Sequence, residues 1–133
     1  SALLGSRMSE RAKETGRAGS IINISSIAAI HPTPDVIPYT AAKAGLNAMT
    51  IGFAQTFGPH VRVNCIMPGA VPTEIMMKAL RLEDDDLPKL EKMLRLPMRR
   101  LGTPEDLGQA VLYFVSPASS WVTGQVIGID GGL

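Results

Sequence analysis

The chain has 133 residues, of which 45% are apolar and 19% charged, a composition typical of one soluble globular domain. The formal net charge is +1 and no basic stripe is present, which argues against nucleic acid as a partner. No apolar run reaches the length of a membrane span. The single cysteine, Cys65, allows no disulfide within the chain and weakly favours the reducing cytoplasm.

The chain starts with a predicted helix over residues 1–15, in which Leu4, Met8 and Ala12 recur at helical spacing. Gly16 to Gly19 ends it. No residue suited to an N-cap precedes this pattern. We therefore expect the chain to begin inside a helix and further residues to lie upstream.

Three short runs of β-branched and apolar residues predict buried strands, over residues 20–25, 61–67 and 125–129. Helix-compatible stretches separate them, over residues 39–57, 74–97 (one or two short helices) and 104–115. The last of these begins at Thr103-Pro104-Glu105-Asp106, which combines an N-cap residue, a proline and two first-turn acids.

A proline-rich segment, residues 27–38, predicts a stiff loop and no helix between the first strand and the helix that follows it. Strands that alternate with long helical segments favour parallel pairing with right-handed crossovers. The sequence therefore predicts an α/β fold. Three parallel strands make a small sheet, so the chain resembles the end of a larger one, in a single unit spanning residues 1–133.

Candidate ligand-binding residues follow the first two predicted strands. Ser25 and Ser26 come after the first strand, and residues 68–73 come after the second. Tyr39 opens the crossover helix between those strands. Ligands of open α/β sheets bind beyond the carboxyl ends of the strands, so Ser26, Tyr39 and residues 68–73 are expected at one rim of the sheet.

Tyr39 and Lys43 lie four residues apart and share one face of the predicted helix. A nearby ammonium favours the phenolate, and a tyrosine in that setting can exchange a proton with a substrate oxygen. Ser26 can donate a hydrogen bond to the same oxygen. This set suits carbonyl–alcohol interconversion if a cofactor supplies the hydride. Taken alone, a Tyr-x-x-x-Lys pair is more often a surface tyrosine beside a solvated lysine.

Several motifs in order along the chain carry a more specific signal. They are Ser26, Tyr39-Thr-Ala-Ala-Lys43-Ala-Gly45, Arg62-Val63-Asn64, Pro68-Gly69-x-x-x-Thr73, Gly102-Thr-Pro-Glu-Asp106, and Val122-Thr-Gly-Gln125 running into Asp130-Gly-Gly132. Together they resemble the classical short-chain dehydrogenase/reductase family, which includes the 3-oxoacyl-acyl-carrier-protein reductases. The resemblance implies the C-terminal half of a doubly wound, Rossmann-type parallel sheet and a cofactor that is NAD or NADP.

The resemblance also implies catalytic roles. Tyr39 would be the proton donor or acceptor, Ser26 would polarise the substrate carbonyl, and Lys43 would bind the nicotinamide ribose and favour the phenolate. The loop that starts at Pro68 and Gly69 would close over the nicotinamide. Within it, the Val71 backbone would meet the carboxamide and the Thr73 hydroxyl would add a cofactor contact. No metal ion is expected.

By the same resemblance, residues 74–97 would form a mobile substrate lid. Its apolar side chains suggest an apolar alcohol or ketone substrate: Met76, Met77, Leu80, Met93 and Leu94. The alternative is that these side chains are ordinary core residues of two short helices. Met76 and Met77 are the lid residues predicted to contact substrate, together with Ser26 and Tyr39.

The family's glycine-rich phosphate turn, the residue that selects between NAD and NADP, and an active-site asparagine have no counterpart in the 133 residues. All three are expected upstream of Ser1. The fragment alone is therefore expected to bind dinucleotide poorly and to be inactive. The substrate, the cofactor choice and the reaction direction stay open.

The sequence also favours an assembly of two or four subunits. Small residues on the Tyr39 helix suggest close approach of another helix in a homodimer or homotetramer, although they can also pack within one subunit: Ala41, Ala42, Ala44, Gly45, Ala48 and Gly52. The last strand is expected to be a sheet edge, which proteins tend to cover, and the resemblance implies that it meets the same strand of a second subunit.

His31 and Asp35 lie in the proline-rich loop, where each is either a plain loop residue or a contact to substrate. Structural roles are expected for the others: Cys65 as a buried apolar side chain, Trp121 packed on the turn before the last strand, and Asn64 and Asp130 holding loops.

Two alternatives to an active alcohol–ketone oxidoreductase follow from the same pattern. One is a non-catalytic interaction or regulatory protein that keeps the fold. The other is a dehydratase or epimerase on the same scaffold. The presence of Ser26, Tyr39 and Lys43 together argues against the first, and the spacing and the C-terminal motif argue against the second.

Overall fold

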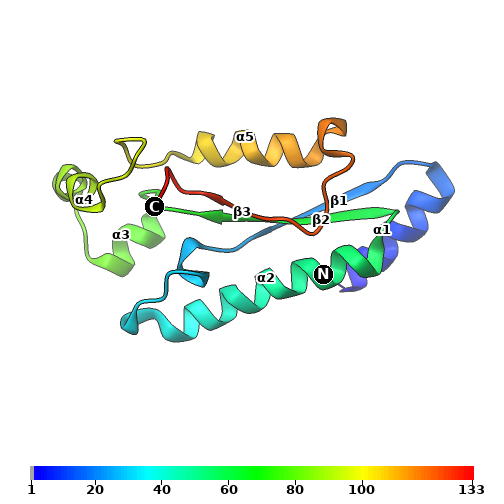
Figure 1. Ribbon diagram of the computed structural model, residues 1–133, viewed down its shortest axis with the longest axis horizontal. Helices are drawn as coiled ribbons and strands as arrows, with labels where there is room; N and C mark the ends of the chain where they lie inside the picture. Colours follow the sequence, from blue (N-terminus) through cyan, green and yellow to red (C-terminus); the bar gives the residue numbers. More distant parts are fainter. Residues whose placement is uncertain (1) are drawn as a thin grey trace.

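A three-stranded parallel sheet lies at the centre of the structure, a computed structural model that describes residues 2–133 (Figure 1). The strands are β1 (Gly19–Ile24), β2 (Val61–Pro68) and β3 (Val126–Ile129), in the order β1-β2-β3. Ser20 pairs with Arg62 and Ile66 with Ile127. The predicted parallel sheet is confirmed, with strand ends within one residue of the expected positions.

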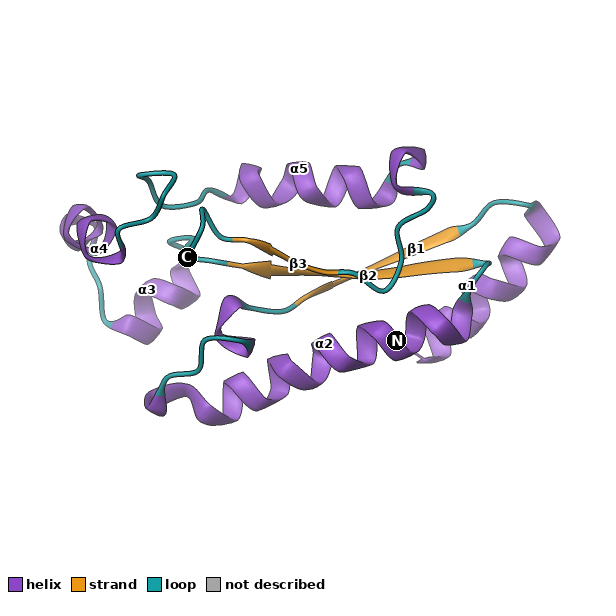
Figure 2. Cartoon of the chain, viewed as in Figure 1, coloured by secondary structure: helices purple, strands orange, loops and turns teal. Residues whose placement is uncertain are grey.

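Helices cover both faces of this sheet (Figure 2). α1 (Ala2–Thr15) and α2 (Ile37–Phe57) lie on one face, and α5 (Pro104–Val115) lies on the other. α3 (Glu74–Leu80) and α4 (Leu87–Leu94) lie beyond the carboxyl end of β2. Position 1, part of the first predicted helix, lies outside the described residues. Within residues 2–133, no helix has both the length and the apolarity needed to cross a bilayer.

The core is built on β2, the central strand. Val61, Val63, Cys65 and Ile66 are each at most 1% exposed, so this strand is buried on both faces, as a central parallel strand must be. Phe57 at the end of α2 packs with Val61 and Val63. Cys65 is confirmed as a small buried side chain, and burial raises the pKa of its thiol.

The proline-rich segment differs in part from the expectation of a plain loop. It holds two 3-10 turns, η1 (Ile27–Ala29) and η2 (Pro34–Val36), and α2 already begins at Ile37. Pro38 lies in the first turn of α2, where a missing backbone N–H leaves no helical hydrogen bond unmade. The prolines therefore shape the start of the helix and do not exclude it.

The interpretation of Trp121 is wrong, because its side chain is 96% exposed. Polar contacts hold the turn before β3 without the indole. The buried Asn64 amide donates to the Val122 carbonyl (2.9 Å) and accepts from the Gln125 N–H (3.1 Å). The Asp130 carboxylate accepts from the Gly132 N–H (2.9 Å). The loop-holding roles of Asn64 and Asp130 are thereby confirmed.

Candidate active site

The segments predicted to carry chemistry meet at one end of the sheet. The carboxyl ends of β1 and β2, the start of α2 and the start of α3 all lie toward the left in Figure 1. η1, which follows Ser26, contacts both α2 and β2. The convergence expected from a right-handed parallel crossover is therefore present in the backbone.

The two adjacent serines at the end of β1 have different roles. Ser25 is buried, its N–H donates to the Ile66 carbonyl (2.8 Å), and its hydroxyl donates to the Lys43 carbonyl (3.0 Å). Ser26 is half-buried, and its Oγ accepts from the Ala28 N–H (3.1 Å) as the N-cap of η1. The Ser26 hydroxyl proton remains available for a ligand oxygen.

Sequence reasoning missed the role of Ser25, which ties the end of β1 to β2 and to α2. Two serines in a row carry no pattern that separates them. The alternation of side chains along a strand predicts that they face opposite ways, but not which of them faces the core.

Lys43 lies between the tyrosine ring and the strand end. Its Nζ is 5.6 Å from the centroid of the Tyr39 ring and donates to the Ile24 carbonyl (2.8 Å). An ammonium has three donors, so two remain for other partners. The Tyr39 side chain is 48% exposed. A half-exposed phenol beside a fixed ammonium is an arrangement that can pass a proton to a ligand in the solvent-facing rim.

The loop after β2 is anchored at its start by a close backbone approach. The Gly69 N–H donates to the Ile129 carbonyl (3.0 Å), and a Cβ at Gly69 would lie 2.5 Å from the Asp130 Cα. Any side chain at position 69 would push β3 and the loop apart. Glycine at this position is therefore required by the contact between the two strand ends.

Farther along the loop, Val71 is buried and its polar backbone groups bond to near neighbours. Its N–H donates to the Gly69 carbonyl (3.0 Å) and its carbonyl accepts from the Thr73 N–H (2.7 Å). Thr73 Oγ accepts from the Met76 N–H (3.3 Å) as the N-cap of α3. The Val71 carbonyl keeps a second lone pair and the Thr73 hydroxyl keeps its proton, so both can still contact a cofactor.

The lid segment consists of short helices, as predicted, and its apolar side chains divide into two groups. Leu90 and Leu96 are buried, whereas Leu80 is 54% and Met93 69% exposed. Met76, Met77 and Leu94 are half-buried. Met77 also lines an open hollow of about 530 Å³ next to the end of the loop. The core interpretation thus fits Leu90 and Leu96 better than the side chains named from the sequence.

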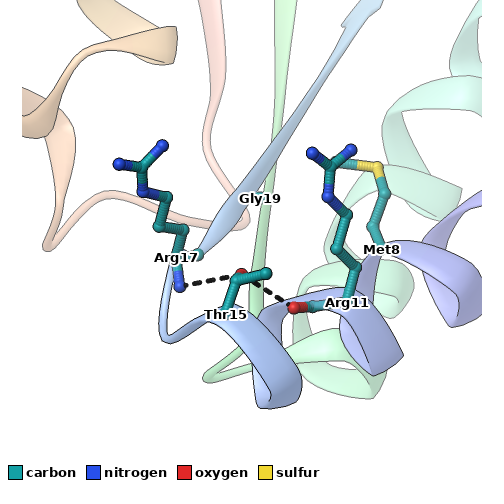
Figure 3. Close-up of a pocket in the computed structure, with 6 residues that line it drawn as sticks. Met8, Arg11, Thr15, Arg17 and Gly19 are labelled. Atoms are coloured by element: carbon teal, nitrogen blue, oxygen red, sulfur yellow. Dashed lines mark hydrogen bonds between the residues drawn. The ribbon is translucent and has the colours of Figure 1, made fainter.

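Another cavity lies at the opposite end of the sheet (Figure 3). It measures about 360 Å³ and is lined by Met8, Arg11 and Gly19, among others. There the Thr15 hydroxyl accepts from the Arg17 N–H (3.3 Å) and donates to the Arg11 carbonyl (2.8 Å). This cavity borders the amino end of β1, whereas the candidate site lies at the carboxyl end of the sheet. The two are therefore separate.

His31 and Asp35 lie in the proline-rich segment and are exposed. Within residues 2–133, neither side chain forms a hydrogen bond or ion pair with Ser26, Tyr39 or Lys43. The plainer interpretation of both as loop residues fits this placement.

The comparisons with known proteins agree with this arrangement. A family model described as Enoyl-(Acyl carrier protein) reductase matches residues 1–133. The chain is 41% identical over 121 residues to the 3-oxoacyl-[acyl-carrier-protein] reductase of Thermotoga maritima, covering 88% of this chain and 46% of that protein. It is 39% identical over 125 residues to the L-rhamnose 1-dehydrogenase (NAD(P)(+)) of Azotobacter vinelandii, covering 92% and 47%.

A solved structure of 7 alpha-hydroxysteroid dehydrogenase, complexed with NADH and 7-oxo glycochenodeoxycholic acid, superposes with a TM-score of 0.83. It is 32% identical in sequence, and the match covers 98% of this chain and 48% of that one. The chain spans about half the length of the curated relatives it matches. The family match over the whole chain and the shared parallel sheet lead to one conclusion: the chain belongs to the short-chain dehydrogenase/reductase family.

Proposed function

We propose that the complete protein interconverts a secondary alcohol and a ketone with NAD or NADP, with Tyr39 as general acid/base. The observation that carries the proposal is the position of Lys43, whose Nζ is fixed on the Ile24 carbonyl and lies 5.6 Å from the Tyr39 ring centroid. The names of the relatives, a 3-oxoacyl reductase and sugar and steroid dehydrogenases, support the same reaction class.

The residues present fit a nicotinamide cofactor. Lys43 has two free N–H donors for ribose hydroxyls, and the Val71 carbonyl and Thr73 hydroxyl retain bonding capacity at the loop. A bound nicotinamide would supply or accept the hydride. The loop itself would exclude water from the reacting carbon, since Val71 is buried against the end of the sheet.

Proton transfer follows from the side chains of the chain itself. In the reducing direction, Ser26 donates a hydrogen bond to the carbonyl oxygen as negative charge develops there. The Tyr39 hydroxyl gives its proton to that oxygen, so the product is a neutral alcohol and the tyrosine becomes a phenolate. The Lys43 ammonium stabilises the phenolate until a proton from solvent restores it. In the oxidising direction each transfer is reversed.

The substrate is proposed to be apolar next to its carbonyl. Met76 and Met77 are both half-buried on α3. The hollow that Met77 lines is otherwise walled mainly by charged side chains, so the proposal rests on the two methionines and not on the hollow. Flexible thioether side chains adapt to apolar ligands of varied shape. Residues 74–97 remain proposed as the lid over this substrate.

The experiment is a cofactor-oxidation assay of the complete protein with NADH and NADPH. The panel holds a short 3-oxoacyl thioester, an apolar cyclic ketone and an enoyl thioester of the same length as the first. We expect the ketones to be reduced and the enoyl thioester to be inert. Reduction of the enoyl thioester alone would overturn the alcohol–ketone assignment. Binding of cofactor with no turnover on any of them would favour the alternative, a non-catalytic interaction protein.

The same proposal includes a homodimer or homotetramer that uses the outer face of α2. Most of the small residues of α2 are exposed, among them Ala41, Gly45 and Gly52, whereas Ala44 is half-buried. A side chain at Gly45 would project into open space. The buried thiol of Cys65 also suits the reducing cytoplasm, where we propose that the protein acts.

Gly45→Arg in the complete protein is expected to lower the mass measured by sedimentation velocity to that of a smaller assembly. The subunit itself has room for the arginine, so the change acts on the partner helix. Gly45→Ala is the matched control, because alanine already occupies neighbouring positions on this face, and it should keep the assembly. An unchanged mass for Gly45→Arg would place the subunit contact elsewhere.

A further inference from the structure

A bidentate ion pair closes the turn that precedes α5. Arg100 Nη1 lies 2.6 Å from Asp106 Oδ2, and Nη2 lies 2.7 Å from Oδ1. Asp106 Oδ2 also accepts from the Thr103 N–H (2.8 Å), and Thr103 Oγ accepts from the Asp106 N–H (3.4 Å), which completes a capping box. Arg100 Nη1 further donates to the Leu101 carbonyl (3.0 Å). We call Arg100 and Asp106 the clasp.

The turn closed by the clasp contacts the middle of the loop after β2. The Gly102 N–H donates to the Ala70 carbonyl (2.9 Å). A Cβ at Gly102 would lie 2.9 Å from Val71 Cγ2 and 3.6 Å from the Ala70 oxygen. The backbone of the turn therefore lies directly against Ala70 and Val71, with no space for a side chain between them.

The loop has little else to fix it at this point. Among residues 2–133, a single backbone hydrogen bond joins residues 70–72 to another part of the fold, and it is the one from the Gly102 N–H to the Ala70 carbonyl. A cavity of about 180 Å³ lies alongside, lined by Val71, Arg100, Asp106 and Ile129, among others. If the turn loosened, Val71 would have room to shift into that cavity.

The ion pair contributes little to the stability of the whole fold, because the Arg100 and Asp106 side chains are 50% and 32% exposed. Its geometry is nevertheless specific, since a guanidinium fork and a carboxylate fix each other in two parallel bonds. Such a pair is suited to fixing the position of the turn before α5 against the loop after β2.

We propose that Arg100 and Asp106 are positioning residues that act through Gly102 to hold Val71 in place for the nicotinamide end of the cofactor. The assignment rests on the proposed function, in which the loop over residues 68–73 contacts the nicotinamide. The clasp touches neither substrate nor cofactor. Its loss would change where the Val71 backbone lies, not which groups carry out the chemistry.

The Asp106 carboxyl stays ionised near neutral pH, so the ion pair of the clasp stays formed there. The Arg100 guanidinium, with the Thr103 N–H, holds the pKa of the Asp106 carboxyl well below its usual range. A carboxyl whose folded-state pKa is lowered contributes stability above its unfolded pKa, and this is lost as pH falls through the lowered value. The effect of removing the clasp should therefore be the same at pH values on either side of neutrality.

The experiment compares two ligands on the complete protein. Reduced cofactor is titrated by nicotinamide fluorescence, and ADP-ribose, which lacks the nicotinamide, by competition against it (its 2′-phosphate form if the protein prefers NADPH). In Arg100→Ala and Asp106→Asn, we expect weaker binding of reduced cofactor and unchanged affinity for ADP-ribose. The kcat should fall by about tenfold to a hundredfold, the cost of a small misplacement near reacting groups.

Gly102→Ala tests the same contact while leaving both groups of the clasp in place, since the added Cβ would lie 2.9 Å from Val71 Cγ2 and 4.0 Å from Asp106 Oδ2. Its Cβ would press on Val71, so the same split between the two ligands is expected. Glu105→Gln is the matched control, because Glu105 is the neighbouring exposed carboxylate in the first turn of α5 and, among residues 2–133, its side chain bonds neither to Arg100 nor to the loop. Hydrogen exchange of the peptide over residues 69–73 should quicken in the clasp variants and not in the control.

Equal loss of both ligands would assign the clasp a merely structural role and overturn the proposal, as would an unchanged affinity for both. If the unsubstituted protein binds cofactor but reduces no ketone, the proposed function fails while the two-ligand comparison still decides on the clasp. If it binds no cofactor, the exchange rates over residues 69–73 decide whether the clasp positions the loop.

Discussion

Replacement of Tyr39 by phenylalanine in the complete protein is expected to lower kcat by about 10²- to 10⁴-fold, the usual contribution of a positioned general acid/base. The ring and its packing beside Lys43 would remain, and only the exchangeable proton would be lost. Since the phenol hydroxyl is proposed to act on the substrate oxygen, cofactor affinity should change little. Steady-state rates and fluorescence titration of reduced cofactor measure the two effects separately.

Tyr113→Phe is the matched control, because Tyr113 is the second of the two tyrosines in the chain and is similarly exposed at 44%, against 48% for Tyr39. It lies on α5, away from the start of α2, and its rate should equal that of the unsubstituted protein. Turnover by Tyr39→Phe close to that of the unsubstituted protein would remove Tyr39 from the mechanism.

Lys43→Ala is expected to harm binding and rate together. The ammonium is proposed to donate to the ribose and to stabilise the phenolate, and hydrogen bonds to charged groups are worth enough to weaken cofactor binding by about tenfold to a hundredfold. The kcat should fall as well, because the Tyr39 phenolate loses its nearby cation. Cofactor titration and steady-state kinetics on the same preparation give both numbers.

A second substitution separates charge from packing. Lys43→Met keeps most of the side-chain stem and removes the ammonium, so it should lose affinity and rate as much as Lys43→Ala does. If Lys43→Met retained cofactor affinity, neither the ammonium nor its bond to the Ile24 carbonyl would be needed for binding, and only the packing of the side-chain stem would remain as a role.

Much of the fold follows from local patterns in the sequence. The three strands are short β-branched runs, and the long helical segments between them favour parallel pairing. β2 is rich in apolar residues, interrupted by Arg62 and Asn64, because it is the central strand and both of its faces are covered. The start of α5 follows from Thr103 and Asp106, whose capping box is local to four residues.

What the sequence could not predict depends on contacts between distant segments. Trp121 reads as a core residue by type, but the turn that contains it is held by Asn64, which lies 57 positions earlier, and this leaves the indole exposed. Ser25 and Ser26 have different roles because only one of them, Ser25, faces α2. The contact of Gly102 with Val71 joins residues about thirty positions apart, beyond the reach of any periodic pattern.

In the candidate site, too, local spacing predicts some features and contacts between distant segments produce the others. The four-residue spacing of Tyr39 and Lys43 on a helix predicts their shared face, and the structure has the lysine beside the ring. The bond from Lys43 to the Ile24 carbonyl joins that helix to the end of β1 and has no sequence signature. It is nevertheless the contact that fixes the ammonium next to the tyrosine.

The most direct test of the acid–base assignment is a crystal structure of the complete protein with oxidised cofactor and a ketone or its alcohol product. The account predicts that one ligand oxygen lies within hydrogen-bond distance, about 2.6–3.2 Å, of both Ser26 Oγ and Tyr39 Oη. It also predicts Lys43 Nζ on the nicotinamide ribose. A bound ligand whose oxygen contacts neither hydroxyl, in a protein that turns that ligand over, would contradict the account.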